Sequence, residues 1–337
     1  MRSALFDNLK FALIILVVAG HVLLPIADTR LTNNLLYTIY SFHMPCFVMV
    51  TGYFSKGIYR NRRFRWDRLL NIIWLYLIFE VLVHITEGLL AGEITWRVDI
   101  WHESGAPWYL LAMIWWYLSI PVFSRLKPAY TLSLVLFMGL VAGYWGEIND
   151  FLALDRTLAF APYFYLGYYA PNHMVSMLRR PKNRWMLALM AVMEAGIVLF
   201  FAYDKLWQFN LIVYGVTYQR LAEPLRNWGG LLRLIWYGFA LILSLGFLSF
   251  IPNKRLFFTK FGERTLQVYI LHRLIRDLAQ YFGWYELINV QYRSHVVLLL
   301  AISVALAFVL SEHHITRAFD WIQNVPRRVC GKVLGRM

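Results

Sequence analysis

The stretch LKFALIILVVAGHVLLPIA, residues 9–27, decides the fold of this chain. An α-helix rises about 1.5 Å per residue, so about 20 apolar residues cross the hydrocarbon core of a bilayer, which is roughly 30 Å thick. The stretch has this length and carries only two ionisable side chains, Lys10 near its start and His21 near its end. It therefore predicts a membrane-spanning helix with a histidine buried in it.

Similar apolar stretches recur along the whole chain of 337 residues. Hydrophobic residues make up 60% of it, charged residues 15%, and the mean hydropathy is +0.51. These values exclude an ordinary soluble domain and predict an all-α, polytopic membrane bundle of about ten transmembrane helices. The predicted spans are 9–27, 35–54, 69–90, 107–123, 130–146, 157–171, 185–203, 230–251, 265–282 and 295–312.

The net charge of +14 comes from basic residues that gather in alternate loops. If the N-terminus is cytoplasmic, most of the 33 Lys and Arg residues fall on the cytoplasmic side, as the positive-inside rule describes. With ten spans, both termini are then cytoplasmic. The basic excess is explained by topology and by contact with anionic membrane lipids, so we expect no nucleic-acid partner.

Two histidines lie inside predicted spans at matching depth. His21 follows Lys10 by eleven residues, which is three helical turns or about 16 Å on the same face. His43 lies about two turns into the next span, which runs the opposite way, and Pro45 removes a backbone donor beside it. Ionisable residues in a membrane are functional candidates by default. The alternative is structural: each histidine hydrogen-bonds a neighbouring helix, and Lys10 anchors the first helix at the interface.

Other candidate residues have both a functional and a structural interpretation. Glu80, in the middle of the third span, can orient a histidine or hold an acceptor hydroxyl, or it is a buried carboxyl paired with another helix. Trp108 and Tyr109 open the fourth span on the outer side, where they can stack on a sugar or belong to an interfacial aromatic belt. The same two interpretations apply to the aromatic residues of the outer loop 204–229, which are Trp207, Tyr214, Tyr218 and Trp228.

Cysteine and histidine spacing gives no sign of a metal site. Cys46 lies in the second span and Cys330 near the C-terminus, so no disulfide is expected. Residues 313–337 combine basic with apolar side chains, which predicts a helix lying on the inner membrane surface. We therefore divide the chain into one transmembrane domain, 1–312, and a basic amphipathic cytoplasmic tail, 313–337.

Several of these residues stand in motifs that resemble those of the acyltransferase 3 family. Asp7-Asn8-Leu9-Lys10, followed by His21, resembles the first-helix signature, in which a basic residue precedes a required histidine by this spacing. The basic residue is Lys here, where Arg is commoner. The branch that the chain resembles most is that of fucose 4-O-acetylase-like proteins. Further matching motifs follow in order: Phe42-His43-Met44-Pro45, Thr51-Gly52-Tyr53, Arg65-Trp66-Asp67-Arg68-Leu69, Trp108-Tyr109-Leu110, Ala161–Tyr168, Phe261-Gly262-Glu263 and Tyr269-Ile270-Leu271-His272.

The resemblance implies a bacterial inner-membrane enzyme that moves an acetyl group from cytoplasmic acetyl-CoA to a hydroxyl of an extracytoplasmic glycan or lipid-linked sugar. It implies no metal cofactor. His272 is a family landmark whose role is structural or in oxyanion stabilisation. The other implied roles are phosphate binding for Lys10, Arg65 and Arg68, catalysis for His21, His43 and Glu80, and acceptor binding for Trp108 and Tyr109.

The residues fit this chemistry on physical grounds as well. A separation of about 16 Å between Lys10 and His21 is close to the reach of the pantetheine arm, and a neutral histidine can take a proton from an attacking hydroxyl. His21 can equally accept the acetyl group itself as a covalent relay. The rival class is a membrane transporter or glycan flippase, which also places ionisable residues in spans. A succinyltransferase is a variant within the same class.

Overall fold

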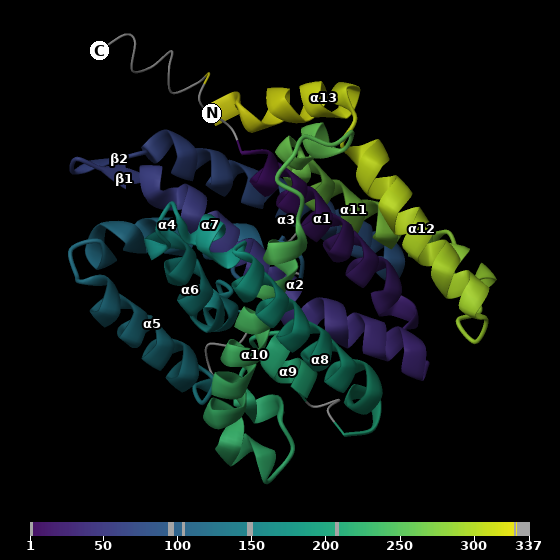
Figure 1. Ribbon diagram of the computed structural model, residues 1–337. Helices are drawn as coiled ribbons and strands as arrows, with labels where there is room; N and C mark the ends of the chain where they lie inside the picture. The colour runs from purple at the N-terminus through teal and green to yellow at the C-terminus, as the bar shows by residue number, and fades with distance from the viewer. Residues whose placement is uncertain are drawn as a thin grey trace.

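The chain folds into one bundle of helices that run in alternating directions (Figure 1). The computed structural model describes residues 3–93, 98–102, 105–146, 151–205, 209–326 and 328. Within these ranges, ten long helices each overlap one of the ten predicted spans: α1 (Ala4–Leu23), α2 (Arg30–Phe54), α3 (Trp66–Ala91), α4 (Trp108–Phe123), α5 (Pro128–Ala142), α6 (Leu154–Tyr169), α8 (Pro181–Lys205), α10 (Gly229–Phe250), α11 (Thr265–Tyr281) and α12 (Arg293–Leu310). The shorter elements include β1 (Tyr59–Arg60), β2 (Arg63–Phe64), α7 (Met174–Leu178), α9 (Phe209–Val213) and α13 (His313–Gln323).

Among the described residues, five segments are long and apolar enough to cross a membrane. Two further helices, α4 and α5, are apolar but shorter. The structure thus confirms an all-α fold with the helices of a multi-pass membrane protein, while ten spans and two cytoplasmic termini remain predictions. The five segments are Ala4–Ile26, Arg30–Gly57, Trp66–Ala91, Leu225–Phe250 and Arg293–Leu310.

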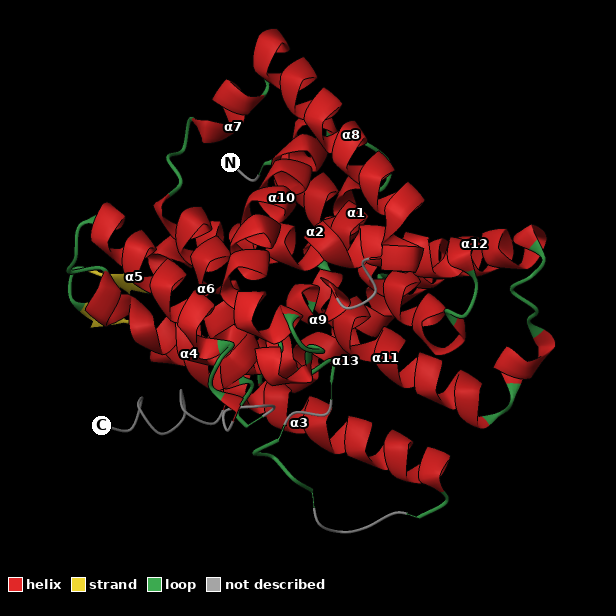
Figure 2. Cartoon of the chain, turned by 90° about the horizontal axis from the view of Figure 1, so that it is seen from below, coloured by secondary structure: helices red, strands yellow, loops and turns green. Residues whose placement is uncertain are grey.

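Helices α1 and α2 lie in the middle of the bundle. Figure 2 shows them between the other helices, with α5 and α12 toward opposite edges. α1 packs against α2, α11 and α12, whereas α2 packs against α6, α8 and α10. The main apolar core includes Phe11 and Ile14 of α1 and Val48 of α2, all of which are buried. Because the two central helices carry His21 and His43, this packing sets where both histidines lie.

A proline interrupts the backbone hydrogen bonds of α2 beside His43. Pro45 has no N–H, so the carbonyl of Ser41, four residues earlier, has no donor within its own helix. Trp236 of α10 provides one, because its Nε1 donates to this carbonyl at 3.1 Å. The carbonyl that the sequence predicted to be freed therefore becomes the point where α10 is attached to α2.

A short hairpin, which we did not predict, connects α2 to α3. Strands β1 and β2 are antiparallel, and the two residues between them, Asn61 and Arg62, have φ values of 52° and 60°. Positive φ at both central residues is what a type I′ turn requires. Figure 1 places this hairpin, the start of α1 and α13 at the same end of the molecule. This arrangement is the one expected if the three segments face the same side of the membrane.

The predicted amphipathic tail begins as helix α13, which is held against α3. Trp74 of α3 donates through Nε1 to the carbonyl of Ile322 at 3.0 Å. Phe319 packs against the main core, while Trp321 on the same helix is exposed. Helix α13 therefore has one face packed on the bundle and another that is exposed, which is typical of a helix that lies along a membrane surface.

Helices α2 and α6 cross in close contact through a pair of glycines. A Cβ atom at Gly52 would lie 1.9 Å from the carbonyl oxygen of Phe164, and one at Gly167 would lie 1.9 Å from the carbonyl oxygen of Met49. Both obstacles are backbone atoms, which cannot rotate away as a side chain does. Small residues at such positions allow membrane helices to approach each other closely.

The substitution Gly167→Ala should force α2 and α6 apart. Since backbone must move, we expect a loss of about 1–3 kcal/mol in the free energy of unfolding, measured as a lower thermal midpoint in detergent. Gly238→Ala on α10 is the matched control, because nothing lies within 4 Å of a Cβ atom at Gly238. Alanine is the better helix former by about 1 kcal/mol, so the control should be neutral or stabilising. Equal midpoints for the two variants would contradict the close crossing.

Candidate active site

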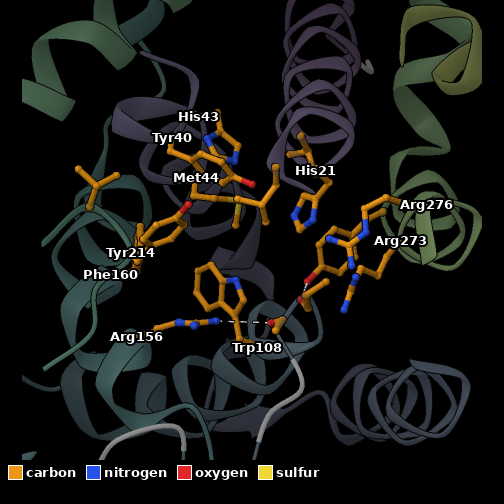
Figure 3. Close-up of a pocket in the computed structure, with 16 residues that line it drawn as sticks. His21, Tyr40, His43, Met44, Trp108, Arg156, Phe160, Tyr214, Arg273 and Arg276 are labelled. Atoms are coloured by element: carbon orange, nitrogen blue, oxygen red, sulfur yellow. Dashed lines mark hydrogen bonds between the residues drawn. The ribbon is translucent and has the colours of Figure 1, made fainter. Parts of the chain in front are cut away.

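His21 and His43 line the same cavity of about 200 Å³ inside the bundle. We call it the histidine cavity. Figure 3 shows the two histidines on one side of it and Trp108 and Arg156 facing them. Its walls come from α1, α2, α4, α6, α11 and two loops, so distant parts of the sequence meet here. The polar and aromatic lining residues are His21, Tyr40, His43, Trp108, Arg156, Phe160, Tyr214, Tyr269, Arg273 and Arg276.

The two histidines, which we predicted at matching depth, are linked by an aromatic ring. The ring centroid of Tyr40 lies 6.4 Å from that of His21 and 5.0 Å from that of His43. In His43, Nδ1 lies 2.7 Å from the carbonyl oxygen of Ile39. A carbonyl only accepts, so Nδ1 carries the proton and Nε2 of the neutral ring is an acceptor. His21, two residues before the last residue of α1, is only partly buried.

Two arginines of α11 also line the histidine cavity, and sequence reasoning missed them. Arg273 lies 2.7 Å from a carboxylate oxygen of Glu87 on α3 and also donates to Asp277. Nε of Arg276 donates to the same Asp277 carboxylate at 2.9 Å. Three charged residues within two turns of a predicted span were the signal that could have identified them, since such charges are rare in membranes.

The opposite wall of the histidine cavity joins a cation to an aromatic ring. The guanidinium of Arg156, near the start of α6, lies 5.8 Å from the ring centroid of Trp108. Trp108, predicted to bind the acceptor, therefore does lie at the cavity, whereas Arg156 was not predicted. A flat ring beside a guanidinium offers both stacking and hydrogen bonding to a polar ligand such as a sugar.

The aromatic outer loop contributes Tyr214, which lies at the histidine cavity. This loop is held by Arg233 of α10, a completely buried side chain that donates to the carbonyls of Gly139, at 3.0 Å, and Val216. Its guanidinium also lies 4.5 Å from the ring centroid of Tyr218. Of the four aromatic residues considered in the loop, one lines the cavity; Trp207 lies outside the described residues.

A second cavity, of about 180 Å³, adjoins the first. We call it the apolar cavity, because most of its lining is aliphatic or aromatic. The two cavities share Val17, Met44 and Tyr269 as lining residues. The apolar cavity also reaches Ile72, near the start of α3, and Thr265, the first residue of α11. It therefore extends from the histidine cavity toward the end of the bundle that carries the hairpin.

Lys10, predicted to bind a phosphate, lies on the α1 face that also carries Val17 and His21. Its Nζ is 3.0 Å from a carboxylate oxygen of Asp7 and 5.8 Å from the ring centroid of Phe54, the last residue of α2. The spacing of seven and eleven residues along α1 brings these three side chains to one side of the helix. Lys10 thus lies toward the hairpin end of the α1 face that carries Val17 and His21.

The remaining predicted residues are distributed between the two cavities and the surface. Arg65 and Arg68 are exposed at the start of α3, where Arg65 pairs with Asp67 at 2.8 Å. Tyr109 lines the apolar cavity rather than the histidine cavity, and its hydroxyl is hydrogen-bonded to that of Thr51. Glu80 is buried on α3 and lines neither cavity. The structure therefore gives no support to the catalytic role predicted for Glu80.

The arrangement suits chemistry carried out by side chains. Within the described ranges, no group of three His, Cys, Asp or Glu residues is arranged to hold a metal ion. The histidine cavity instead offers ring nitrogens, guanidinium groups and aromatic faces. Imidazole serves as a proton acceptor or as a nucleophile, and guanidinium groups stabilise negative charge as it develops.

Comparison with known proteins identifies the family. The model of the acyltransferase-domain family matches residues 4–312, nearly the whole chain. The chain belongs to the acyltransferase 3 family. This match confirms the family that the motifs resemble and favours an acyltransferase over a transporter; the fucose 4-O-acetylase-like branch remains a prediction. The chain is therefore a multi-helix member of a family of acyltransferases.

One curated protein is similar over a shorter stretch. The nodulation protein NolL of Sinorhizobium fredii (strain NBRC 101917 / NGR234) is 30% identical over 129 residues. These residues are 34% of this chain and 34% of NolL, so the match spans about a third of that relative's length. No solved structure matches the chain.

Proposed function

We propose that this acyltransferase moves an acetyl group from cytoplasmic acetyl-CoA to a sugar hydroxyl of a cell-surface or exported polysaccharide, across the bacterial inner membrane. The observation that carries the proposal is the pair of adjoining cavities with the shared residues Val17, Met44 and Tyr269. Their linings extend from His21 to Ile72 and Thr265, and we infer a path that continues from there to the basic end of the bundle. A thioester at the end of a long, thin arm is a substrate that fits such a path.

We place the acetyl donor at the basic end of the bundle because of the charge there. Acetyl-CoA carries phosphates at one end, and Lys10, Arg65 and Arg68 all lie at the hairpin end of the molecule. Charge-assisted contacts to phosphate are strong and specific. From Lys10 the pantetheine arm passes through the apolar cavity, and over about 16 Å it brings the thioester to the level of His21. The apolar lining suits the uncharged arm.

We assign the chemical step to His21. As a general base, its Nε2 takes the proton of the acceptor hydroxyl, the new C–O bond forms at the acetyl carbonyl carbon, and the C–S bond breaks to release the CoA thiolate. As a nucleophile, it carries the acetyl group between donor and acceptor. In both routes Arg273 and Arg276 stand near enough to the cavity to stabilise negative charge on the carbonyl oxygen.

We place the acceptor at the wall of the histidine cavity opposite the two histidines. Trp108, Tyr214 and Tyr40 offer aromatic faces, and Arg156 offers hydrogen-bond donors between them. Sugars are bound by stacking on such rings together with polar contacts at their edges. We therefore assign this wall to a glycan or a lipid-linked sugar, with Trp108 as the central acceptor-binding residue.

The variant His21→Ala should insert into the membrane normally and lose acyl transfer. Removing a general base costs about a hundredfold to ten-thousandfold in rate, while an apolar residue in a membrane helix inserts at least as well as histidine. The measurement is release of free CoA from acetyl-CoA by purified protein. His295→Ala on α12, which lines neither cavity, is the control and should keep wild-type rates. Near-wild-type turnover by correctly inserted His21→Ala protein would exclude the mechanism.

The variant Lys10→Gln should weaken donor binding. A charge-assisted hydrogen bond contributes about 1.5–3 kcal/mol, so the KM for acetyl-CoA should rise roughly tenfold to a hundredfold, with little change for the acceptor. Lys10→Arg, which keeps the charge, should stay close to wild type. Lys127→Gln, at the exposed start of α5, is the control for lost surface charge. An unchanged KM in Lys10→Gln would leave Lys10 with a topological role only.

The proposed route requires that the hairpin and the aromatic loop lie on opposite sides of the membrane. Helices α3, α4, α5, α6 and α8 separate them, which is an odd number of crossings. In a protein with Cys46 and Cys330 replaced, a cysteine at Asn61 should react only with reagents that reach the cytoplasm. A cysteine at Asn227, in the loop before α10, should react in intact cells. Labelling of both from one side would remove the basis of transmembrane acetyl transfer.

A further inference from the structure

His272 of α11 lies beside His21 of α1. The two rings have centroids 5.0 Å apart and planes at 77° to each other. His272 is completely buried in α11 and is not among the residues that line the histidine cavity. Its ring therefore contacts the imidazole of His21 but is not placed to meet the substrate.

The hydrogen bonds of His272 define which of its nitrogens carries the proton. Nδ1 lies 2.8 Å from the carbonyl oxygen of Val268, one turn earlier on α11. Because a carbonyl only accepts, this nitrogen is the donor, and Nε2 of the neutral ring carries a lone pair. Within the described part of the chain, that Nε2 is buried and has no hydrogen-bond partner.

His21 also has a ring nitrogen without a hydrogen-bond partner. Its Nδ1 is also buried and has no hydrogen-bond partner within the same described ranges. Buried polar atoms are nearly always paired, so two unpaired nitrogens on facing rings require an explanation. A hydrogen bond from Nδ1–H of His21 to Nε2 of His272 would pair both atoms at once.

We propose that His272 is a positioning residue that accepts this hydrogen bond and thereby fixes the tautomer of His21. With the proton held on Nδ1, Nε2 of His21 carries the lone pair and is the nitrogen left to face the histidine cavity. The proposal rests on the proposed function for its catalytic consequence, whereas the tautomer itself is a property of the protein without substrate.

Each step of the reaction is served by this tautomer. Nε2 of His21 takes the proton of the acceptor hydroxyl as the C–O bond forms, and it returns that proton to the CoA thiolate after the C–S bond breaks. In the relay route the same Nε2 lone pair forms the bond to the acetyl carbon as the C–S bond breaks. The acceptor oxygen then displaces Nε2 from that carbon, and the hydroxyl proton passes to the CoA thiolate. His272 keeps its own proton on Nδ1 throughout and stabilises the positive charge that His21 carries transiently. The proposal therefore holds for both routes.

The first test compares His272→Leu with His272→Gln in acetyl-CoA turnover. Leucine fills a similar space without an acceptor, and we expect kcat to fall about a hundredfold or more while the KM for acetyl-CoA changes less than about twofold. Glutamine provides an acceptor oxygen and should recover at least about tenfold over leucine. His295→Gln is the control for a lost histidine outside the site. Equal rates for the leucine and glutamine variants would overturn the proposal.

The second test is independent of turnover. Nitrogen NMR of histidine-labelled wild-type protein in detergent should show His21 protonated at Nδ1, with the His21 signal assigned from His21→Gln protein, and in His272→Gln the same tautomer should persist. Protonation of His21 at Nε2 in the wild type would overturn the proposal even if His272→Leu fails to fold. If the wild type does not turn over acetyl-CoA but shows the expected tautomer, the proposed function fails and the His21–His272 pair stands.

Discussion

Lipid offers no hydrogen-bond partner, so the backbone polar groups inside this bundle must be paired by the protein itself. The constraint is sharpest at Pro45, where α2 leaves the carbonyl of Ser41 without a donor and Trp236 of α10 supplies one. His43 lies between the proline and that carbonyl. The interruption that opens α2 therefore also fastens α10 to it and places a histidine at the wall of the cavity. Without the tryptophan, the break would leave an unpaired carbonyl in the core.

The same constraint shapes the charges around the site. Arg273 is balanced by Glu87 and Asp277 from two helices, whereas Arg233 is buried among backbone carbonyls and the ring of Tyr218. A guanidinium spreads its charge over five donors, which lets it be paired in these different ways. Arg273 is thereby a fixed positive group beside the histidine cavity, where the carbonyl of the proposed thioester substrate would develop negative charge.

Features that depend on local sequence could be predicted, whereas features that depend on contacts between distant residues could not. Length and hydropathy predict the helices because crossing a membrane depends on local composition, and helical periodicity aligns Lys10 with His21 on one face. Which helices become neighbours depends on contacts far apart in the sequence. Arg156 of α6 and Tyr214 of the outer loop therefore had no local signal that links them to His21. Glu80 looked like a partner for a histidine, but it lines neither cavity, and its role remains a prediction.

The shared lining of the two cavities has a consequence for the cell that holds this protein. A membrane that stores energy as a proton gradient tolerates no open aqueous pore, yet the proposed acetyl transfer needs a path through most of its thickness. The apolar cavity is lined by groups such as Phe47, Met113 and Leu266 that hold water poorly. Narrow passages of this kind dry out and stop hydrated ions. In the proposed route, the neutral and slender pantetheine arm would pass where a hydrated ion cannot, and acetyl transfer would leave the proton gradient intact.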